Sequence, residues 1–568
     1  MKGQNKVKKL FITALILFSL SVFAFALPEA NPTVRVGLYY GNNAMISANL
    51  QNIDGIGYRF GHFDASHNFV SEYSDSSTNR ISMLKDSNIY YHDGKFYASS
   101  QPAGSTLIGA YHIQLNNTYS TADDVYNMVA SLKFQGIPAF ASIENDSYTI
   151  RIGSYQNAAL AQADVTRYLH LGGGIVVGNN PKCITVVNTA NGEILFEYDT
   201  ENYLAVYPSI DETIMPLTWF KGYKYNGGFQ YMRDGGNISV INFVPMQEYV
   251  KGVVPYEMSA SWPLEALKAQ ALCARTYSLY NYGKHGKNFD VCATTDCQVY
   301  SGANSAGPNS NLAVDETLGQ YILYDGKPIN AVFSSSNGGA SEDCENVWSA
   351  ALPYLRGVYD NHEDLDTSTN GRWTYEYSSA ELTYILNAKG YPCSNIVNMY
   401  VKEFTNMGNV KTLTLVDSSG KEFNFSKEKA RTILYSSTYK KYTHSQRYTV
   451  KRKGSEDNSK ALLYINNSST AVNALYDSIF AVGKNGTTRL PSNSVSIITG
   501  SGITNFKPEQ SSSPTIVPGD AVFVVSGTGW GHNLGMSQNG AKAMAIKGWS
   551  AEDIIHFYYT DVEIYNAA

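Results

Sequence analysis

Residues 253–277 constrain this chain more than any other stretch, because they carry the signals of a short turn followed by a helix. Ser261 or Trp262 suits the cap position and Pro263 suits the first helical position. The apolar residues that follow recur at three- and four-residue steps, namely Leu264, Leu267, Ala271 and Ala274. That spacing predicts a helix with one buried face, packed against a core.

One carboxylate, Glu257, lies on the expected turn just before this helix. Its neighbours Tyr256, Met258 and Trp262 offer a partly apolar setting, which disfavours the charged form and raises the pKa of a carboxyl group. A raised pKa is what a general acid needs near neutral pH. The competing interpretation is a solvated glutamate before an ordinary helix.

Three separated motifs follow one another along the chain. The first reads V-P-Y-E-M and E-A-L-K-A-Q-A-L-C-A-R-T-Y within residues 254–277, and the second reads F-S-S-S-N-G-G-A-S-E-D-C-E-N-V-W at 333–348. The third reads G-T-G-W-G-H-N-L-G-M-S-Q-N-G-A-K at 527–542. Together they resemble the stage II sporulation protein D and amidase-enhancer (LytB) family over roughly residues 232–563, with Cys273 standing where the family usually has Ala.

The resemblance implies a peptidoglycan lytic transglycosylase in which Glu257 is the acid and the base. Such an enzyme cleaves between N-acetylmuramic acid and N-acetylglucosamine and leaves a 1,6-anhydro end. Its preferred glycan strands lack stem peptides, and it requires no cofactor. The rival interpretation is a non-catalytic peptidoglycan-binding protein that stimulates a cell-wall amidase, because the amidase-enhancer branch does so.

Arg275 matches the arginine of the family's A-R-T-Y sequence and is a candidate to bind substrate or stabilise negative charge. We expect it near the groove but not paired tightly to Glu257, since a direct ion pair would lower the pKa of that carboxyl group. A structural ion pair is the alternative for Arg275.

Five further residues of the second and third motifs are candidates for sugar binding: Ser335, Ser336, Asn337, Trp530 and His532. An indole ring stacks on a sugar, and hydroxyl, amide and imidazole groups form hydrogen bonds with sugar hydroxyls. The alternatives are an ordinary Ser/Gly turn and a structural histidine.

His285, Cys292 and Cys297 lie close enough in sequence to ligate one metal ion, and Cys and His are zinc ligands. Related proteins have an additional His where this chain has Asp296, which still offers a carboxylate. Three interpretations stay open: a structural zinc, a Cys292–Cys297 disulfide, and free thiols.

The first 26 residues read as a secretory signal peptide, with four lysines, an apolar stretch from Leu10 to Phe23 and a small-residue cleavage site at 24–26. An uncleaved membrane anchor is the alternative, although no other stretch is expected to cross a membrane. We therefore expect an extracytoplasmic protein. A net charge of −6 over 568 residues gives no indication of nucleic-acid binding.

The length allows several domains, and we expect a multidomain α+β protein. The predicted division is a small β-rich domain at 27–105, a glycan-binding domain at 106–177, a strand-rich connection at 178–231 and the large mixed domain at 232–565.

The second of these regions shows a β-α-β-β-α order. Strands are predicted at 111–115, 139–143 and 148–155, and helices at 121–135 and 156–170. This is the order of a small ferredoxin-like unit. It resembles the sporulation-related (SPOR) repeat, which binds peptidoglycan glycan strands, and a purely structural domain is the alternative.

Overall fold

The computed structural model describes residues 28–567 except Asp146, Asp234, Thr369 and most of 455–520. Within 455–520 only the backbone of short strands is described: β29 (Leu462–Leu463), β30 (Val472–Asn473), β31 (Ile479–Gly483), β32 (Gly486–Leu490), β33 (Ser496–Thr499) and β34 (Gly502–Asn505). The predicted signal peptide at 1–26 lies outside the described residues.

Seven strands form the first sheet, in the order β20-β1-β19-β18-β15-β3-β4. They are β1 (Thr33–Tyr39), β3 (Tyr58–Phe63), β4 (Phe69–Asp75), β15 (Leu204–Tyr207), β18 (Gly228–Met232), β19 (Ser239–Pro245) and β20 (Val291–Cys292). The apolar run of β19 is buried over five successive residues, as expected for a central strand covered on both faces.

Ten strands form the second sheet, in the order β12-β9-β11-β10-β14-β13-β5-β2-β16-β17. Six of them come from outside the predicted glycan-binding region: β2 (Ser47–Asn52), β5 (Arg80–Lys85), β13 (Ile184–Asn188), β14 (Ile194–Tyr198), β16 (Leu217–Phe220) and β17 (Tyr223–Asn226). Between β5 and β9 in the chain, a small third sheet consists of β6 (Ile89–His92), β7 (Lys95–Tyr97) and β8 (Thr106–Ile108).

The predicted boundary at residue 105 is not reflected in these sheets. Strand β5 pairs with β13, and β3 pairs with β15, so residues before 105 and after 178 share hydrogen-bonded ladders. The expected separate domain at 27–105 and the expected connection at 178–231 therefore build one β structure together. Such pairing between distant strands leaves no local signal in the sequence.

The SPOR-like region has the predicted element order, with one extra strand. It consists of β9 (Tyr111–Tyr119), α1 (Ala122–Phe134), β10 (Ala139–Glu144), β11 (Ser147–Tyr155), α2 (Ala158–Asp164), a 3₁₀ helix (Val165–Leu171) and β12 (Gly174–Gly178). Thr121 caps α1 by accepting a hydrogen bond from the Asp124 amide. The predicted second helix is thus α-helical only over its first half.

Helix α4 (Leu264–Tyr280) is the centre of the next layer. It packs against α3 (Met246–Glu257), α5 (Pro308–Asp315), α9 (Gln538–Ile546), α10 (Ala551–Tyr558) and β21 (Gln320–Tyr324). Pro263 occupies the cap position, so the helix begins at Leu264, one residue later than predicted. Residues on nearly every side of α4 are buried, so the expected single apolar face is too narrow a description.

Short strands from distant parts of the chain complete this layer. Strand β21 pairs with β22 (Lys327–Pro328) and with β37 (Glu563–Asn566), while β23 (Phe333–Ser334) pairs with β36 (Met536–Ser537) in parallel. The β23–β36 pair places the second and third sequence motifs side by side. Helix α6 (Cys344–Val347) ends the second motif.

Residues 372–453 and 521–528 form an inserted domain with its own hydrophobic core. One sheet has the order β24-β35-β28 and the other β25-β26-β27. The elements are β24 (Arg372–Ser378), α7 (Ser379–Ala388), β25 (Ile396–Phe404), β26 (Val410–Asp417), β27 (Glu422–Ser426), α8 (Glu428–Thr432), β28 (Tyr448–Arg452) and β35 (Val522–Thr528). The predicted large domain at 232–565 thus contains two cores.

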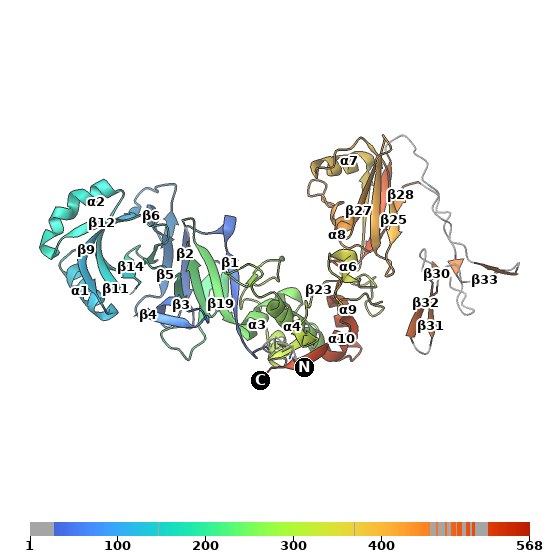
Figure 1. Ribbon diagram of the computed structural model, residues 1–568, viewed down its shortest axis with the longest axis horizontal. Helices are drawn as coiled ribbons and strands as arrows, with labels where there is room; N and C mark the ends of the chain where they lie inside the picture. Colours follow the sequence, from blue (N-terminus) through green and yellow to red (C-terminus); the bar gives the residue numbers. More distant parts are fainter. Residues whose placement is uncertain are drawn as a thin grey trace, which may run out of the picture.

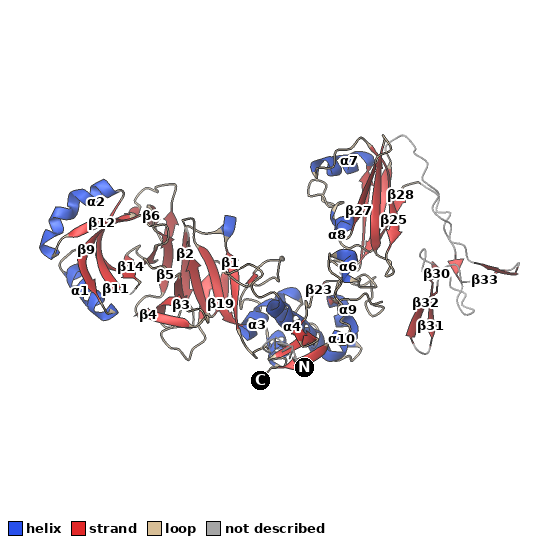
Figure 2. Cartoon of the chain, in the orientation of Figure 1, coloured by secondary structure: helices blue, strands red, loops and turns tan. Residues whose placement is uncertain are grey.

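The arrangement of these parts is clear in Figure 1, where the N-terminal sheets lie at one end and the inserted domain at the other. Figure 2 shows that helices α3, α4, α9 and α10 gather between them. Buried Glu342 joins the helical layer to the inserted domain by accepting hydrogen bonds from Thr405 and Asn409 at 2.5 and 2.7 Å. Among the described residues, no helix combines the length and apolarity needed to span a bilayer.

Candidate functional site

The sequence predicted that Glu257 lies on a turn. In the structure it is instead the last residue of α3. Pro255 lies in the final turn of this helix and has no N–H to donate, and Met258 already has extended backbone angles. The helix therefore stops at Glu257 and fixes its backbone, while Met258 turns into the core.

The carboxyl group of Glu257 is largely removed from solvent. Its Oε1 atom accepts a hydrogen bond from the Val299 amide at 3.1 Å. Burial raises the pKa of Glu257, while the Val299 amide and the side-chain amide of Gln538 oppose that rise. Burial prevails because neither partner is a cation, so the geometry agrees with the raised pKa expected for this residue.

The contact with Gln538 joins the first and third motifs. Gln538 is the first residue of α9, and its Nε2 also donates to Oε1 of Gln270 on α4 at 3.2 Å. A second contact links the same motifs, since the Lys542 ammonium lies 4.8 Å from the ring centroid of Trp262. The first and third motifs thus meet at Glu257, although Gln538 was not among the predicted site residues.

Arg275 does not face a groove. It is fully buried, and its guanidinium donates to the side chains of Gln247 and Thr317 and to the carbonyl oxygens of Val314 and Gln320. The predicted substrate-binding role of Arg275 is therefore not supported by its position. These bonds tie α4 to α3 and α5, which is a structural role, although the partners are neutral groups rather than the anion that we had considered.

The serine-rich loop is also mostly internal. Ser336 donates to Oε2 of Glu363 at 2.8 Å, and Asn337 donates to Oδ2 of Asp360 at 2.9 Å, while both are buried. Their predicted sugar contacts are therefore not available in this conformation. Ser335 is half-buried and accepts a hydrogen bond from Asn370 at 2.8 Å.

Gly338 explains why this loop needs glycine. It has φ of 67°, and a Cβ atom there would lie 2.5 Å from the backbone of Thr528. The second motif can approach β35 so closely only because this position has no side chain.

Glu363 is a second buried carboxyl group that the sequence did not indicate. Burial raises its pKa, and hydrogen bonds from serines, including Ser336 and Ser537, oppose the rise. Its Oε1 atom is buried without a hydrogen-bond partner among the described residues. Ser537 directly precedes Gln538, so adjacent residues of the third motif contact the two carboxyl groups. Glu363 lies outside all three motifs, which is why pattern reasoning missed it.

Trp530 keeps the exposure expected of a sugar-stacking residue, with 43% of its surface accessible. Its ring stacks on His444 with centroids 3.5 Å apart and an interplanar angle of 13°. His532 lies nearby against Trp348, with ring centroids 5.3 Å apart. Burial lowers the pKa of His532 to about 4, so its imidazole is neutral near neutral pH.

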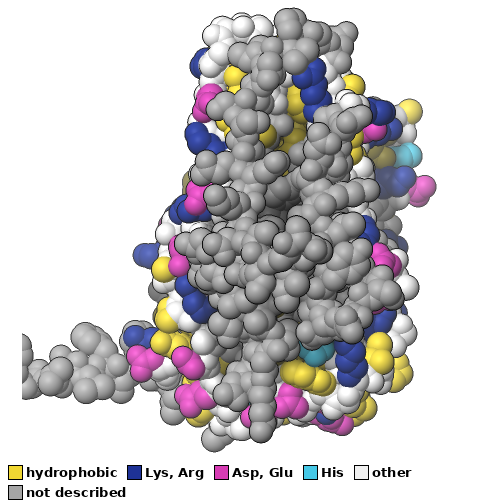
Figure 3. Space-filling model, turned by 90° about the vertical axis from the view of Figure 1, so that its right-hand side faces the viewer, with side chains coloured by type: hydrophobic (Ala, Val, Ile, Leu, Met, Phe, Trp, Pro, Cys, Tyr) yellow, Lys and Arg dark blue, Asp and Glu magenta, His cyan; other side chains and the backbone are white. Residues whose placement is uncertain are grey.

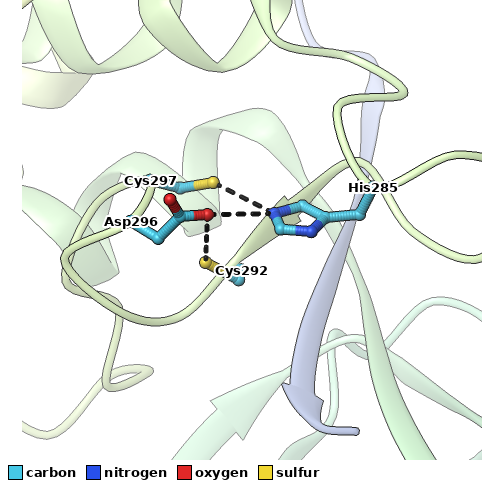
Figure 4. A group of neighbouring side chains, drawn as sticks. All are labelled: His285, Cys292, Asp296 and Cys297. Atoms are coloured by element: carbon cyan, nitrogen blue, oxygen red, sulfur yellow. Dashed lines mark hydrogen bonds and ion pairs between the residues drawn. The ribbon is translucent and has the colours of Figure 1, made fainter. Parts of the chain in front are cut away.

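His285, Cys292 and Cys297 converge as predicted, and Asp296 joins them (Figure 4). Their ligand atoms all lie within 4.8 Å of one another. Nε2 of His285 is 3.4 Å from Sγ of Cys297 and 3.7 Å from Oδ2 of Asp296. A tetrahedral zinc ion, with Zn–S near 2.3 Å and Zn–N near 2.0–2.1 Å, separates S and N ligands by about 3.5 Å.

The four donors therefore fit a structural zinc site. Cys292 and Cys297 are both free thiols, so the alternative of a disulfide between them is not realised in this structure. Sequence reasoning gave Asp296 less weight because it replaces a histidine of the related proteins, yet its carboxylate lies with the other three donors. Cys292 lies on β20, which pairs with β1.

Comparisons with known proteins match two parts of the chain. Residues 234–324 match the family model described as "Stage II sporulation protein", and residues 108–177 match the SPOR domain. The chain thus carries a domain of the stage II sporulation protein family and, before it, a SPOR domain. The first match contains Glu257 and the loop from His285 to Cys297, whereas the second and third motifs lie beyond it.

Several curated proteins are similar to parts of the chain. The amidase enhancer of Bacillus subtilis (strain 168) is 33% identical over 310 residues, which is 55% of this chain and 39% of that protein. Stage II sporulation protein D of Bacillus amyloliquefaciens is 38% identical over 138 residues, 22% of this chain and 40% of that protein. An uncharacterized protein of Brachyspira hyodysenteriae is 42% identical over 139 residues, 24% of this chain and 38% of that protein. The matched stretches span about 40% of these relatives.

Proposed function

We propose that this chain is an extracytoplasmic peptidoglycan lytic transglycosylase that acts in cell-wall remodelling or sporulation. The observation that carries the proposal is the position of Glu257, a half-buried carboxyl group with a raised pKa that contacts Val299 and Gln538. The names of the matched family and relatives support the cell-wall and sporulation setting.

The proposed reaction needs one carboxyl group. Protonated Glu257 donates its proton to the oxygen of the bond between N-acetylmuramic acid and N-acetylglucosamine, and that bond breaks. The resulting carboxylate accepts the proton of the muramic acid 6-hydroxyl as its oxygen bonds to C1. The products are a 1,6-anhydro end and a free 4-hydroxyl, and Glu257 regains its proton.

We propose supporting roles for two other parts of the chain. The SPOR domain binds glycan strands and raises the concentration of substrate near Glu257, because two linked sites on one polymer increase avidity. The four donors around Cys292 hold a structural zinc that fixes the loop between β20 and Val299, and the reaction itself requires no metal-activated water. A signal peptide at 1–26 would export the chain.

The second candidate function is a non-catalytic enhancer of a cell-wall amidase. The extent of the match to the amidase enhancer favours it, since that match spans 55% of this chain. In this case Glu257 takes no part in a proton transfer, and the protein acts through glycan binding and contact with the amidase.

Glu257→Gln separates the two functions, because it keeps the shape of the side chain and removes the transferable proton. A positioned general acid contributes roughly 10²–10⁴-fold to a rate, so release of anhydro-saccharides from purified glycan strands should fall by that order. Glu316→Gln, at an exposed glutamate after α5, is the matched control and should cleave normally. If wild-type protein releases no anhydro-saccharides without an amidase present, the enhancer function stands.

Metal analysis tests the zinc site separately. Protein purified without chelator should contain about one zinc ion per chain, and Cys297→Ser should lose most of it, since a tetrahedral site needs all four donors. A mass spectrum with Cys292 joined to Cys297 in the native protein would contradict this proposal while leaving the role of Glu257 untouched.

A further inference from the structure

Arg431 on α8 lies at the edge of the candidate site, between two histidines. Its Nη1 atom donates to the carbonyl oxygen of His444 at 3.4 Å, and its charge helps to lower the pKa values of both His444 and His532. Its Nη2 pairs with Glu428 on the same helix, while its Nε is buried without a hydrogen-bond partner among the described residues. The buried Nε cannot reach a ligand, but 22% of the side-chain surface of Arg431 is accessible, and its ion-pair partner Glu428 is more exposed still.

A row of aromatic rings passes through His444, whose carbonyl oxygen accepts the hydrogen bond from Arg431. His444 stacks on exposed Trp530, and its Nε2 shares a hydrogen bond with the Tyr375 hydroxyl at 2.9 Å. Burial, followed by the charge of Arg431, lowers the pKa of His444 to about 4, so the imidazole is neutral at neutral pH. Tyr442 and half-exposed Tyr435 continue the row, with ring centroids 4.7 Å apart. Flat rings with polar edges suit the apolar faces and hydroxyl groups of sugars.

The inserted domain carries a net positive charge, which favours an anionic polymer as its ligand. This domain contains 14 Lys and Arg against 6 Asp and Glu, whereas the whole chain contains 43 against 49. Figure 3 shows Lys and Arg side chains, with Asp and Glu among them, along both edges of one face of the molecule. An excess of cations in one domain of an acidic chain attracts polyanions to that domain.

We propose that Arg431 binds the lactyl carboxylate of a muramic acid residue while Trp530 and Tyr435 contact sugar rings of a peptide-free glycan strand. This inference rests on the proposed function, and it names the group that selects the substrate. The lactyl group carries a free carboxylate only where no stem peptide is attached, because the peptide converts it to a neutral amide. A guanidinium binds a carboxylate through two parallel hydrogen bonds. Glu428 occupies Arg431 until the strand replaces it.

The test compares two forms of one labelled glycan fragment, with free lactyl carboxylates and with the same groups converted to neutral methylamides. Binding is measured in Glu257→Gln protein, which does not consume the fragments. The parent should bind the free acid about tenfold more tightly than the amide, since one charge-assisted contact is worth about that factor. Added Arg431→Gln should abolish the preference without weakening binding of the amide.

Two further variants keep the test falsifiable. Arg372→Gln, at an exposed arginine of the same domain that pairs with Asp366, should leave the preference unchanged. Glu428→Gln removes the internal competitor and should tighten binding of the free acid a few-fold, which tests the inference even if Arg431→Gln does not fold. A preference retained in Arg431→Gln, or absent from the parent, would overturn the inference.

Failure of this inference is distinguishable from failure of the proposed function. If wild-type protein releases no anhydro-saccharides but Arg431 controls the preference for free carboxylates, the carboxylate site stands and the protein is a binder. If cleavage depends on Glu257 and the two fragments bind equally, the enzyme stands and the carboxylate site does not.

Discussion

Two glutamates of this chain, Glu197 buried in the ten-stranded sheet and half-buried Glu257 at the end of α3, have opposite acid–base behaviour. Glu197 is fully buried, yet its pKa is lowered, because His112 and Arg151 outweigh the effect of burial. Arg151 donates to Oε2 of Glu197 at 2.7 Å and also pairs with Asp199 at 2.7 Å. Glu257 has only neutral donors, and its pKa is raised.

The difference teaches that burial alone does not make a proton donor. A carboxyl group beside a buried cation stays charged and holds a fold together, whereas one with only neutral partners binds its proton more tightly. The same distinction agrees with the position of Arg275, the nearest arginine in the first motif, which bonds neutral oxygens away from Glu257.

Removing the cation beside Glu197 is expected to give the largest effect. Arg151→Met leaves a buried carboxylate without its partner, and breaking a buried pair in this way destabilises a protein by about 3–5 kcal/mol. Thermal or denaturant unfolding of the N-terminal sheets should report this loss. Lys133→Gln, which breaks the exposed pair with Glu193, should change the free energy of unfolding by less than about 1 kcal/mol.

A loss as small for Arg151→Met as for Lys133→Gln would show that the buried network does not stabilise the fold. Glu197 and Glu257 would then differ in the direction of their pKa shifts but not in their contribution to stability.

The sequence predicted those parts of the structure that local patterns determine. The helix predicted at 121–135 is α1 (Ala122–Phe134), which Thr121 caps. The Asp93–Gly94 turn joins β6 to β7 with φ of 54° and 73°, and an Asp-Gly pair favours such a turn. Turns, caps and short-range periodicity are written in adjacent residues.

Contacts between distant segments could not be predicted in the same way. The motif around Glu257 identified the candidate acid, but nothing local indicated that Gln538 would meet it from α9. The burial of Arg275 and Ser336 follows from packing against segments far along the chain, and so does the unexpected Glu363. Asp296 was placed in the metal loop only as a departure from a pattern, and its geometry gives it a ligand position.

Asp86 offers a second way to examine the buried network. Burial and the charge of Glu197 raise its pKa to about 7, against the opposing effects of His112, Arg233 and the Asn180 amide. Its raised pKa makes a stabilising contribution that is fully present below about pH 4, where the unfolded chain also holds the proton, and lost as the pH rises to about 7. The slope from one such group is at most about 1.4 kcal/mol per pH unit.

Asp86→Asn should remove this slope between about pH 4 and 7, as measured by denaturant unfolding at a series of pH values. Asp123→Asn, at an exposed position of α1, should keep the slope of the wild-type protein. Equal slopes in wild-type protein and Asp86→Asn would mean that the charge of Glu197 does not reach Asp86.

The smallest expected effect comes from giving Glu257 the kind of partner that Glu197 has. Gln538→Lys places a cation at the position that now holds a neutral amide, and a nearby cation lowers the pKa of a carboxyl group by about one unit or more. Each unit lowers the protonated fraction of Glu257 about tenfold at neutral pH, so cleavage should fall by about that factor and recover at acid pH. Gln538→Glu should shift the alkaline limb of the pH–rate profile the opposite way, because a like charge raises the pKa. A rate loss in Gln538→Lys that persists unchanged at acid pH would point to altered geometry, and the contrast between Glu197 and Glu257 would then not explain which of them can transfer a proton.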